Sequence, residues 1–189
     1  MPLPATDKAS RADIARIALT QDGVMEEGGN NCGPKIRMYQ SATWLAPGPW
    51  PWCAAFVDWV IREWTHRFQP RGEPLYRGFT GEAWRPLTAG AQDLENWGRK
   101  RGLVILPPTA DVEAGDIVVY DFGHCGFITE DRSRTATTVL TIEGNTGAAG
   151  LRDAPTGDGV FQKKRDRALV RSFVRMELDP NWTPPTKAV

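Results

Sequence analysis

The amino-acid sequence predicts an α+β fold in which N-terminal helices pack on a C-terminal antiparallel β-sheet. In the first half of the chain, apolar residues recur at helical spacing. After Gly102 the pattern changes to alternation with many β-branched residues, which is typical of strands. Helices that come first and strands that come second indicate an α+β fold with an antiparallel sheet.

Four segments in the first half are predicted to be helical. Ile14, Ile17 and Ala18 share one face of an amphipathic helix, and Gly23 follows as a stop. Pro34 is a favoured first helical residue. The third segment is apolar almost all round and should run through the core. The predicted helices span residues 8–21, 34 to about 44, 52–68 and 88–101.

Five strands are predicted in the second half, at residues 116–121, 124–130, 137–143, 159–163 and 169–176. The Pro- and Gly-rich stretch 70–86 is predicted to be a long surface loop. We expect one domain over residues 1–189, with a core at about 8–177 and an irregular tail at 178–189.

The charge balance excludes some partners. Lys plus Arg and Asp plus Glu each number 23, so the net charge is zero and no basic footprint for nucleic acid or an anionic membrane is expected. The N-terminus has no apolar signal core, and no apolar run reaches membrane-spanning length. We therefore expect a monomer made in the cytoplasm without a signal peptide.

Cys53 is the strongest candidate nucleophile among the three cysteines. It follows the rigid Pro-Trp-Pro-Trp segment 49–52 and opens the predicted buried helix. Unpaired N–H groups and the helix dipole at such a position stabilise a thiolate. The alternative is that Cys53 is simply a small buried hydrophobic residue, which is the commoner fate of a free cysteine.

His124 is the better candidate general base of the two histidines. Glycines on either side of the His-Cys pair leave room for another group to approach its ring. His66 lies at the polar end of the central helix beside Arg67, and we interpret it as a solvated surface residue. The alternative for His124 is a turn histidine that bonds only to the backbone.

Glu143 and Asn145 are candidates for the group that orients His124. Strand alternation predicts that they share one face, opposite Ile142, so that either could accept the second ring N–H. A nucleophile, a base and a polar orienter are the three parts that thiol catalysis requires. Alternatively, Asn145 and Gly147 only supply backbone freedom in a turn.

The remaining cysteines are predicted to have no catalytic role. Cys125 should face the opposite side of its strand from His124, and nothing near Cys32 suggests a function. A zinc site built from Cys32, Cys53, His124 and Cys125 has the right ligand types but remains a minor alternative, because adjacent residues in a strand point apart.

Aromatic residues before the nucleophile are candidates for substrate binding. Trp50 and Trp52, together with Gly123, could line a groove for a glycan or peptide. More often, such tryptophans serve in core or rim packing.

Four short motifs occur in a specific order across residues 51–146. They are Pro-Trp-Cys-Ala-Ala-Phe-Val (51–57), Gly-Asp-Ile-Val-Val-Tyr (115–120), Gly-His-Cys-Gly-Phe-Ile (123–128) and Glu-Gly-Asn-Thr (143–146). Together they resemble the CHAP domain, a cysteine- and histidine-dependent amidohydrolase/peptidase group. The resemblance implies a papain-like α+β fold in which the nucleophile helix packs on an antiparallel sheet.

The resemblance also implies a mechanism. Cys53 would attack an amide carbonyl, and His124 would take its proton and then protonate the leaving amine. Glu143 or Asn145 would orient the ring, and the Cys53 backbone N–H would help to bind the oxyanion. The Asp-rich calcium loop of some relatives has no counterpart here, so we predict no metal and no cofactor.

Bacterial peptidoglycan is the substrate that this resemblance implies. A chain with no room for a wall-binding module favours a compact phage lysin or an effector delivered to a rival's periplasm, acting there or in the cell wall. An immunity or delivery protein is then an expected partner. The alternatives are a thiol amidase that acts on a small-molecule or protein amide and, from another class, a non-catalytic or zinc-stabilised binding domain.

Overall fold

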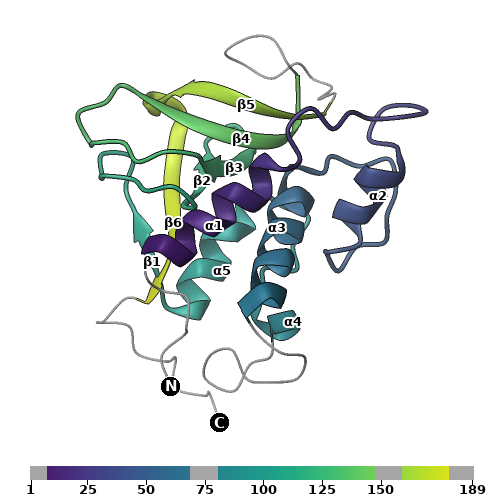
Figure 1. Cartoon of the computed structure of the whole chain (residues 1–189), viewed down its shortest axis with the longest axis horizontal. Helices are drawn as coiled ribbons and strands as arrows, with labels where there is room; N and C mark the ends of the chain where they lie inside the picture. Colours follow the sequence, from purple (N-terminus) through teal and green to yellow (C-terminus); the bar gives the residue numbers. More distant parts are fainter. Residues whose placement is uncertain (1–7, 69–80, 148–158, 179–189) are drawn as a thin grey trace.

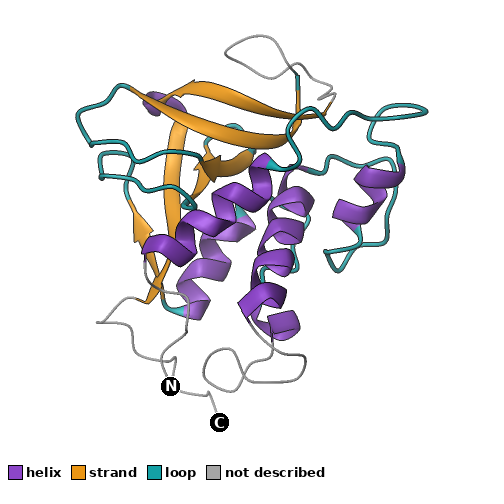
Figure 2. Ribbon diagram, viewed as in Figure 1, coloured by secondary structure: helices purple, strands orange, loops and turns teal. Residues whose placement is uncertain are grey.

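The computed structural model describes residues 8–68, 81–147 and 159–178. In these residues the helices precede the strands in the chain, which confirms the predicted α+β class (Figures 1 and 2). The helices are α1 (Lys8–Leu19), α2 (Pro34–Gln40), α3 (Cys53–Phe68), α4 (Gly81–Trp84) and α5 (Asp93–Arg101). The strands are β1 (Leu103–Leu106), β2 (Ile117–Tyr120), β3 (Cys125–Ile128), β4 (Thr138–Thr146), β5 (Gly159–Asp166) and β6 (Val170–Leu178).

The six strands form one antiparallel sheet in the order β1-β6-β2-β3-β4-β5. Strand β6 therefore returns from the end of the described chain to lie between β1 and β2. Strands β3 and β4 are neighbours, with Phe127 opposite Ile142. This pairing matters because the two strands carry two of the predicted site residues at their ends.

Helix α3 is the central element of the helical layer. It contacts α1, α2 and α4 as well as β3 and β4, so one helix joins the helical layer to the middle of the sheet (Figure 1). Its buried residues include Phe56, Val57 and Val60. Because the segment is apolar on most sides, burial on both flanks is the arrangement that removes most apolar surface from water.

Helix α2 packs on α3 through Tyr39. The Tyr39 ring stacks on Trp52 with centroids 5.5 Å apart and meets Phe56 and Trp59 edge-on. Its hydroxyl donates to Gln21 Oε1 at 2.9 Å. The segment after α1 and the helix before α3 are thereby joined to the start of α3.

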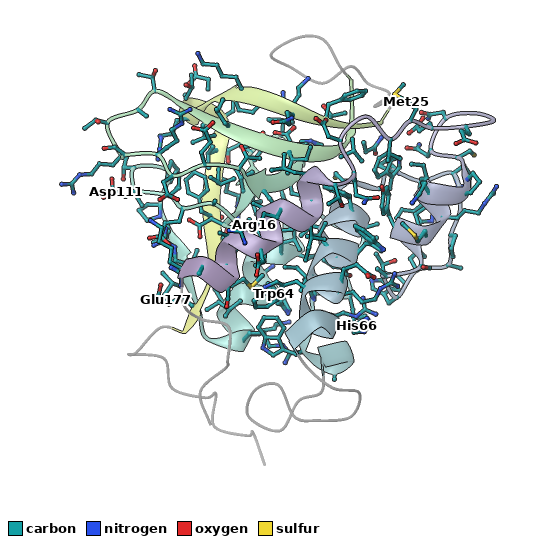
Figure 3. The ribbon with its side chains drawn as sticks, viewed as in Figure 1. Arg16, Met25, Trp64, His66, Asp111 and Glu177 are labelled. Atoms are coloured by element: carbon teal, nitrogen blue, oxygen red, sulfur yellow. The ribbon has the colours of Figure 1, made fainter. Side chains whose placement is uncertain are left out.

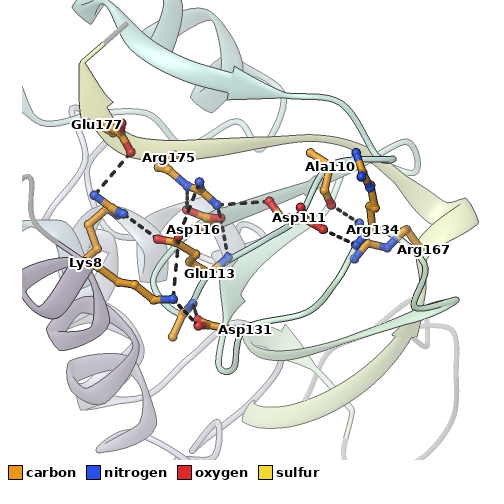
Figure 4. A network of polar contacts seen from close by, with 12 residues as sticks. Lys8, Ala110, Asp111, Glu113, Asp116, Asp131, Arg134, Arg167, Arg175 and Glu177 are labelled. Carbon is orange, nitrogen blue, oxygen red and sulfur yellow. Dashed lines mark hydrogen bonds and ion pairs between the residues drawn. The ribbon is translucent and has the colours of Figure 1, made fainter.

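Helix α1 is tied to the sheet by a polar network (Figure 4). Arg11 Nη2 donates to Glu113 Oε2 at 2.5 Å, and Lys8 pairs with Asp131. Arg175 on β6 donates to both oxygens of the fully buried Asp116, at 3.0 and 2.8 Å. Burial raises the pKa of Asp116, and Arg175 opposes this shift, so the pair offsets part of the cost of burying the carboxylate.

Several predicted boundaries were wrong. Strand β1 was missed, α2 ends at Gln40, and α5 begins at Asp93 rather than at 88. Within the predicted loop 70–86 the structure has α4, and Trp84 is fully buried with its carbonyl bound by Trp97 Nε1 at 2.7 Å. Residues 70–80 of that loop lie outside the described residues, as does the tail from residue 179.

No described helix has both the length and the apolar character needed to cross a membrane.

Candidate active site

Cys53 is the first residue of α3, at the end of the helix that faces the sheet. The backbone N–H of Trp52 donates to Asn145 Oδ1 at 2.8 Å, and the Trp52 carbonyl accepts the N–H of Phe56. The chain therefore enters the helix in a defined direction. Cys53 is 7 % exposed, so its sulfur lies in a largely water-excluded place beside the first N–H groups of the helix.

Gly144 allows α3 to approach β4 closely. A Cβ at this position would lie 2.7 Å from both Phe56 Cβ and Trp52 Cζ3, closer than carbon atoms can pack. Only a residue without a side chain lets the nucleophile helix lie directly on the strand that carries Glu143.

His124 immediately precedes β3, at the end of a tight hairpin turn. The Tyr120 N–H donates to the His124 carbonyl at 2.9 Å, and Gly123 takes the positive φ of 80° that the turn needs. The imidazole lies nearly parallel to the rings of Tyr120 and Phe122, with centroids 5.9 and 5.8 Å away. The ring of His124 is thus buried and held by its own hairpin.

Glu143 binds His124 directly. His124 Nε2 lies 3.0 Å from Glu143 Oε2, and both side chains are buried. Because a carboxylate only accepts hydrogen bonds, Nε2 carries the proton of this contact and Nδ1 is left for Cys53. The structure therefore brings Cys53, His124 and Glu143 together, with His124 between the other two.

The electrostatics of the three residues favour a thiolate–imidazolium pair. Hydrogen bonding from Cys125 lowers the pKa of Cys53 well below its usual range; burial opposes this, and His124 and the Ala54 N–H add to it. Burial would lower the pKa of His124, but Cys53 and Glu143 raise it to about 10. Burial likewise opposes ionisation of Glu143, yet His124 and Arg165 hold its pKa far below normal.

The predicted role of Asn145 as an orienter is not the one that its geometry favours. A β-bulge between Gly144 and Thr146 gives Asn145 a positive φ of 57°, which breaks the strand alternation used to place it beside Glu143. Its Oδ1 accepts the Trp52 N–H, and its Nδ2 donates to Asn31 Oδ1 at 3.3 Å. Asn145 therefore fixes the start of the nucleophile helix, whereas Glu143 binds the base.

Cys125 was predicted to face away from the site, and this was wrong. It is fully buried, and its thiol hydrogen bonds to Cys53, which raises the pKa of Cys125 in addition to the effect of burial. The expectation assumed regular strand alternation, but His124 precedes β3 and Cys125 is the first residue of the strand. Two consecutive side chains can then both reach the nucleophile.

The Cys125 thiol should stabilise the Cys53 thiolate. Replacing Cys125 with alanine should lower the thiolate fraction of Cys53 by about tenfold on the acid side of its titration, because hydrogen bonds to charged groups are worth about 1.5–3 kcal/mol. Ultraviolet absorbance of the thiolate against pH, in a Cys32→Ala background, measures this. The Cys125→Ser variant keeps a donor and should restore most of the fraction; equal titrations for the alanine variant and its parent would contradict the role.

The three predicted substrate-binding residues differ in how far they are buried. Trp52 is fully buried against Tyr39 and donates from Nε1 to Glu26 at 2.9 Å, so its ring is unable to line a groove. Trp50 is half-buried and donates to the Ala46 carbonyl, while Gly123 is exposed next to His124. Trp50 and Gly123 therefore retain surface that a substrate could contact.

Two other residues that the sequence set aside, His66 and Cys32, are not among the described groups that chiefly shift the pKa values of Cys53, His124 and Glu143. His66 is exposed at the opposite end of α3 (Figure 3). Cys32 is half-buried, and all three cysteines are free thiols. Across the described ranges, no group of three or more His, Cys, Asp and Glu residues could hold a metal ion.

Sequence reasoning missed the residues that surround Glu143. Tyr120 and Thr141 donate their hydroxyls to Glu143 Oε1 at 2.7 and 2.6 Å, and Arg165 donates to both oxygens. Residues 162–166 are all polar in the sequence, so only the structure shows that Lys163 and Arg165 on β5 are buried between exposed neighbours. A strand that turns basic residues inward requires a buried acceptor.

A family model described as the CHAP domain matches residues 45–145, slightly more than half of the chain. This segment contains Cys53, His124 and Glu143. No curated protein and no solved structure matches the chain.

Proposed function

The chain belongs to the CHAP-domain family of cysteine- and histidine-dependent amidohydrolases, and from this premise we propose that it cleaves an amide or peptide bond of bacterial peptidoglycan. The observation that carries the chemistry is the buried contact of Cys53, His124 and Glu143 at the start of α3. CHAP domains are generally related to peptidoglycan, and this supports the choice of substrate.

Acylation follows from the protonation states of the pair. The Cys53 thiolate attacks the carbonyl carbon, and the carbonyl electrons form an oxyanion that the first N–H groups of α3 can stabilise. When the tetrahedral intermediate collapses, the C–N bond breaks and His124 gives its Nδ1 proton to the leaving nitrogen. The products of this half are a free amine and a thioester on Cys53.

Deacylation reverses the role of the histidine. Neutral His124 takes a proton from water at Nδ1, and the resulting hydroxide attacks the thioester carbonyl. The C–S bond then breaks and its electron pair returns to sulfur. Throughout both steps, His124 keeps a proton on Nε2 and donates it in a hydrogen bond to Glu143.

Digestion of purified sacculi tests the substrate. Wild-type protein should release soluble fragments, and their masses should identify the bond that is cut. The Cys53→Ala variant at the same concentration should release none. Intact sacculi after prolonged incubation with wild type would reject peptidoglycan as the substrate, and activity on a γ-glutamyl or polyamine amide would then select a non-wall amidase.

A further inference from the structure

Arg165 contacts both carboxylate oxygens of Glu143. It comes from β5 and is fully buried. Its Nε lies 3.0 and 3.1 Å from the two Glu143 oxygens, and its Nη2 contacts Oε2. The guanidinium also lies 5.6 Å from the centre of the Tyr120 ring, which donates to the same carboxylate. A buried carboxylate and a buried guanidinium each need the other, since an unpaired buried charge is costly.

The charge around Glu143 changes during the proposed reaction. In the resting pair, the His124 imidazolium is one cation beside the carboxylate. After acylation His124 is neutral, so that cation is lost while Glu143 remains buried. Burial raises the pKa of an uncompensated carboxyl. At this stage Arg165 is, among the described residues, the cation that still contacts Glu143.

The protonation of Glu143 decides where the proton of His124 lies. An ionised Glu143 only accepts, so the neutral imidazole must keep its proton on Nε2 and present an unprotonated Nδ1 to the reacting atoms. A protonated Glu143 could instead donate to Nε2. The ring proton would then move to Nδ1, where it would prevent His124 from accepting a proton from water.

We propose that Arg165 is a positioning residue for the hydrolysis proposed above: it keeps Glu143 ionised while His124 is neutral, and so holds His124 in the Nε2–H tautomer. Tyr120 and Thr141 add neutral donors to the same carboxylate, but neither brings a compensating charge.

Nitrogen NMR of the histidine rings tests the tautomer without any substrate. The chain has two histidines, and the exposed His66 serves as an internal reference. In a Cys53→Ala background the thiolate no longer raises the pKa of His124, and spectra recorded at a pH above the remaining titration of the ring report its neutral form. The parent should show His124 protonated at Nε2. Arg165→Met and Arg165→Gln should each show a population protonated at Nδ1, while Arg165→Lys should keep the parent form.

Sacculus digestion across pH gives the second readout, with Cys53 present. Arg165→Met and Arg165→Gln should each slow hydrolysis by about a hundredfold or more. Loss of the cation raises the pKa of Glu143. The pH below which the hydrolysis rate of these variants falls should therefore be higher than in wild type. Arg165→Lys keeps the charge but not the paired N–H groups of the guanidinium, so its rate should lie between those of wild type and the neutral variants. Arg167 is the matched control: it is also buried but binds backbone carbonyls of Ala110 and Ala136, so Arg167→Met should leave the tautomer and the pH profile unchanged.

The outcomes separate the two proposals. A His124 ring that stays in the Nε2–H form in both neutral variants, with pH profiles like that of Arg167→Met, would overturn the role of Arg165. If neither neutral variant folds, Arg165→Lys decides, because an Nδ1-protonated ring in that variant would also overturn it. If the tautomer responds as expected but wild type leaves sacculi intact, the positioning role stands and only the peptidoglycan substrate fails.

Discussion

Replacing Cys53 with alanine should lower the hydrolytic rate by about a millionfold, because Cys53 is the side chain at the start of α3 that hydrogen bonds to His124. The substitution removes one sulfur atom from a nearly buried site, so the fold should persist. Fragment release from sacculi, with circular dichroism of the purified variant, measures both expectations.

The matched control for this variant is Cys32→Ala. Cys32 is a half-buried free thiol in the loop before α2, and it was set aside as a nucleophile on sequence grounds. Its removal should leave the rate within about threefold of wild type, since surface substitutions away from a site have small effects. Retained hydrolysis by Cys53→Ala, or equal losses in both variants, would show that Cys53 is not the nucleophile.

Replacing Glu143 with glutamine should lower the hydrolytic rate by about 10³–10⁴-fold, although the two side chains have the same shape. The amide can donate to Nε2 of His124 and so favour the wrong tautomer of the base. The same change removes the counter-charge of the fully buried Arg165. We therefore also expect a loss of about 3–5 kcal/mol in the free energy of unfolding, the usual cost of breaking a buried ion pair.

Glu95→Gln is the matched control for Glu143→Gln. Glu95 on α5 also accepts from two arginines, Arg99 and Arg171, but both partners are exposed to water, which screens these ion pairs. Its substitution should cost less than about 1 kcal/mol and leave hydrolysis unchanged. Urea unfolding and sacculus digestion of both variants make the comparison; a Glu143→Gln variant as active as Glu95→Gln would remove Glu143 from the mechanism.

The helices and strands that the sequence predicted well are those in which apolar residues recur at a regular spacing. Helices α1 and α3 have long apolar faces, and strands β2 to β6 alternate or are β-branched, so their order and class were recoverable. Strand β1 is only four residues long and follows α5 after one residue, which leaves little pattern to detect. Helix α4 is a single turn whose burial depends on Trp97 and other distant residues.

The sequence alone could identify only those residues of the candidate site whose neighbours along the chain are distinctive. Cys53 and His124, which the structure brings together, were recognisable as candidates because a helix start and a glycine-flanked turn are visible in the sequence. The placements of Asn145 and Cys125 were wrong, because a β-bulge and a strand end changed the alternation. Arg165 escaped notice because its partner lies 22 residues earlier and meets it only through the pairing of β4 with β5.

Alkylation of Cys53 by iodoacetamide as a function of pH is the most direct test of the thiolate–imidazolium pair. Mass spectrometry of the digested protein separates Cys53 from Cys32 and Cys125, and the measurement needs no substrate. Cys53 of wild type should react rapidly well below about pH 8, where an ordinary thiol is protonated. In His124→Ala this reactivity should be lost over the same range. A Cys53 that reacts only at the pH of an ordinary thiol, equally in both proteins, would contradict the account.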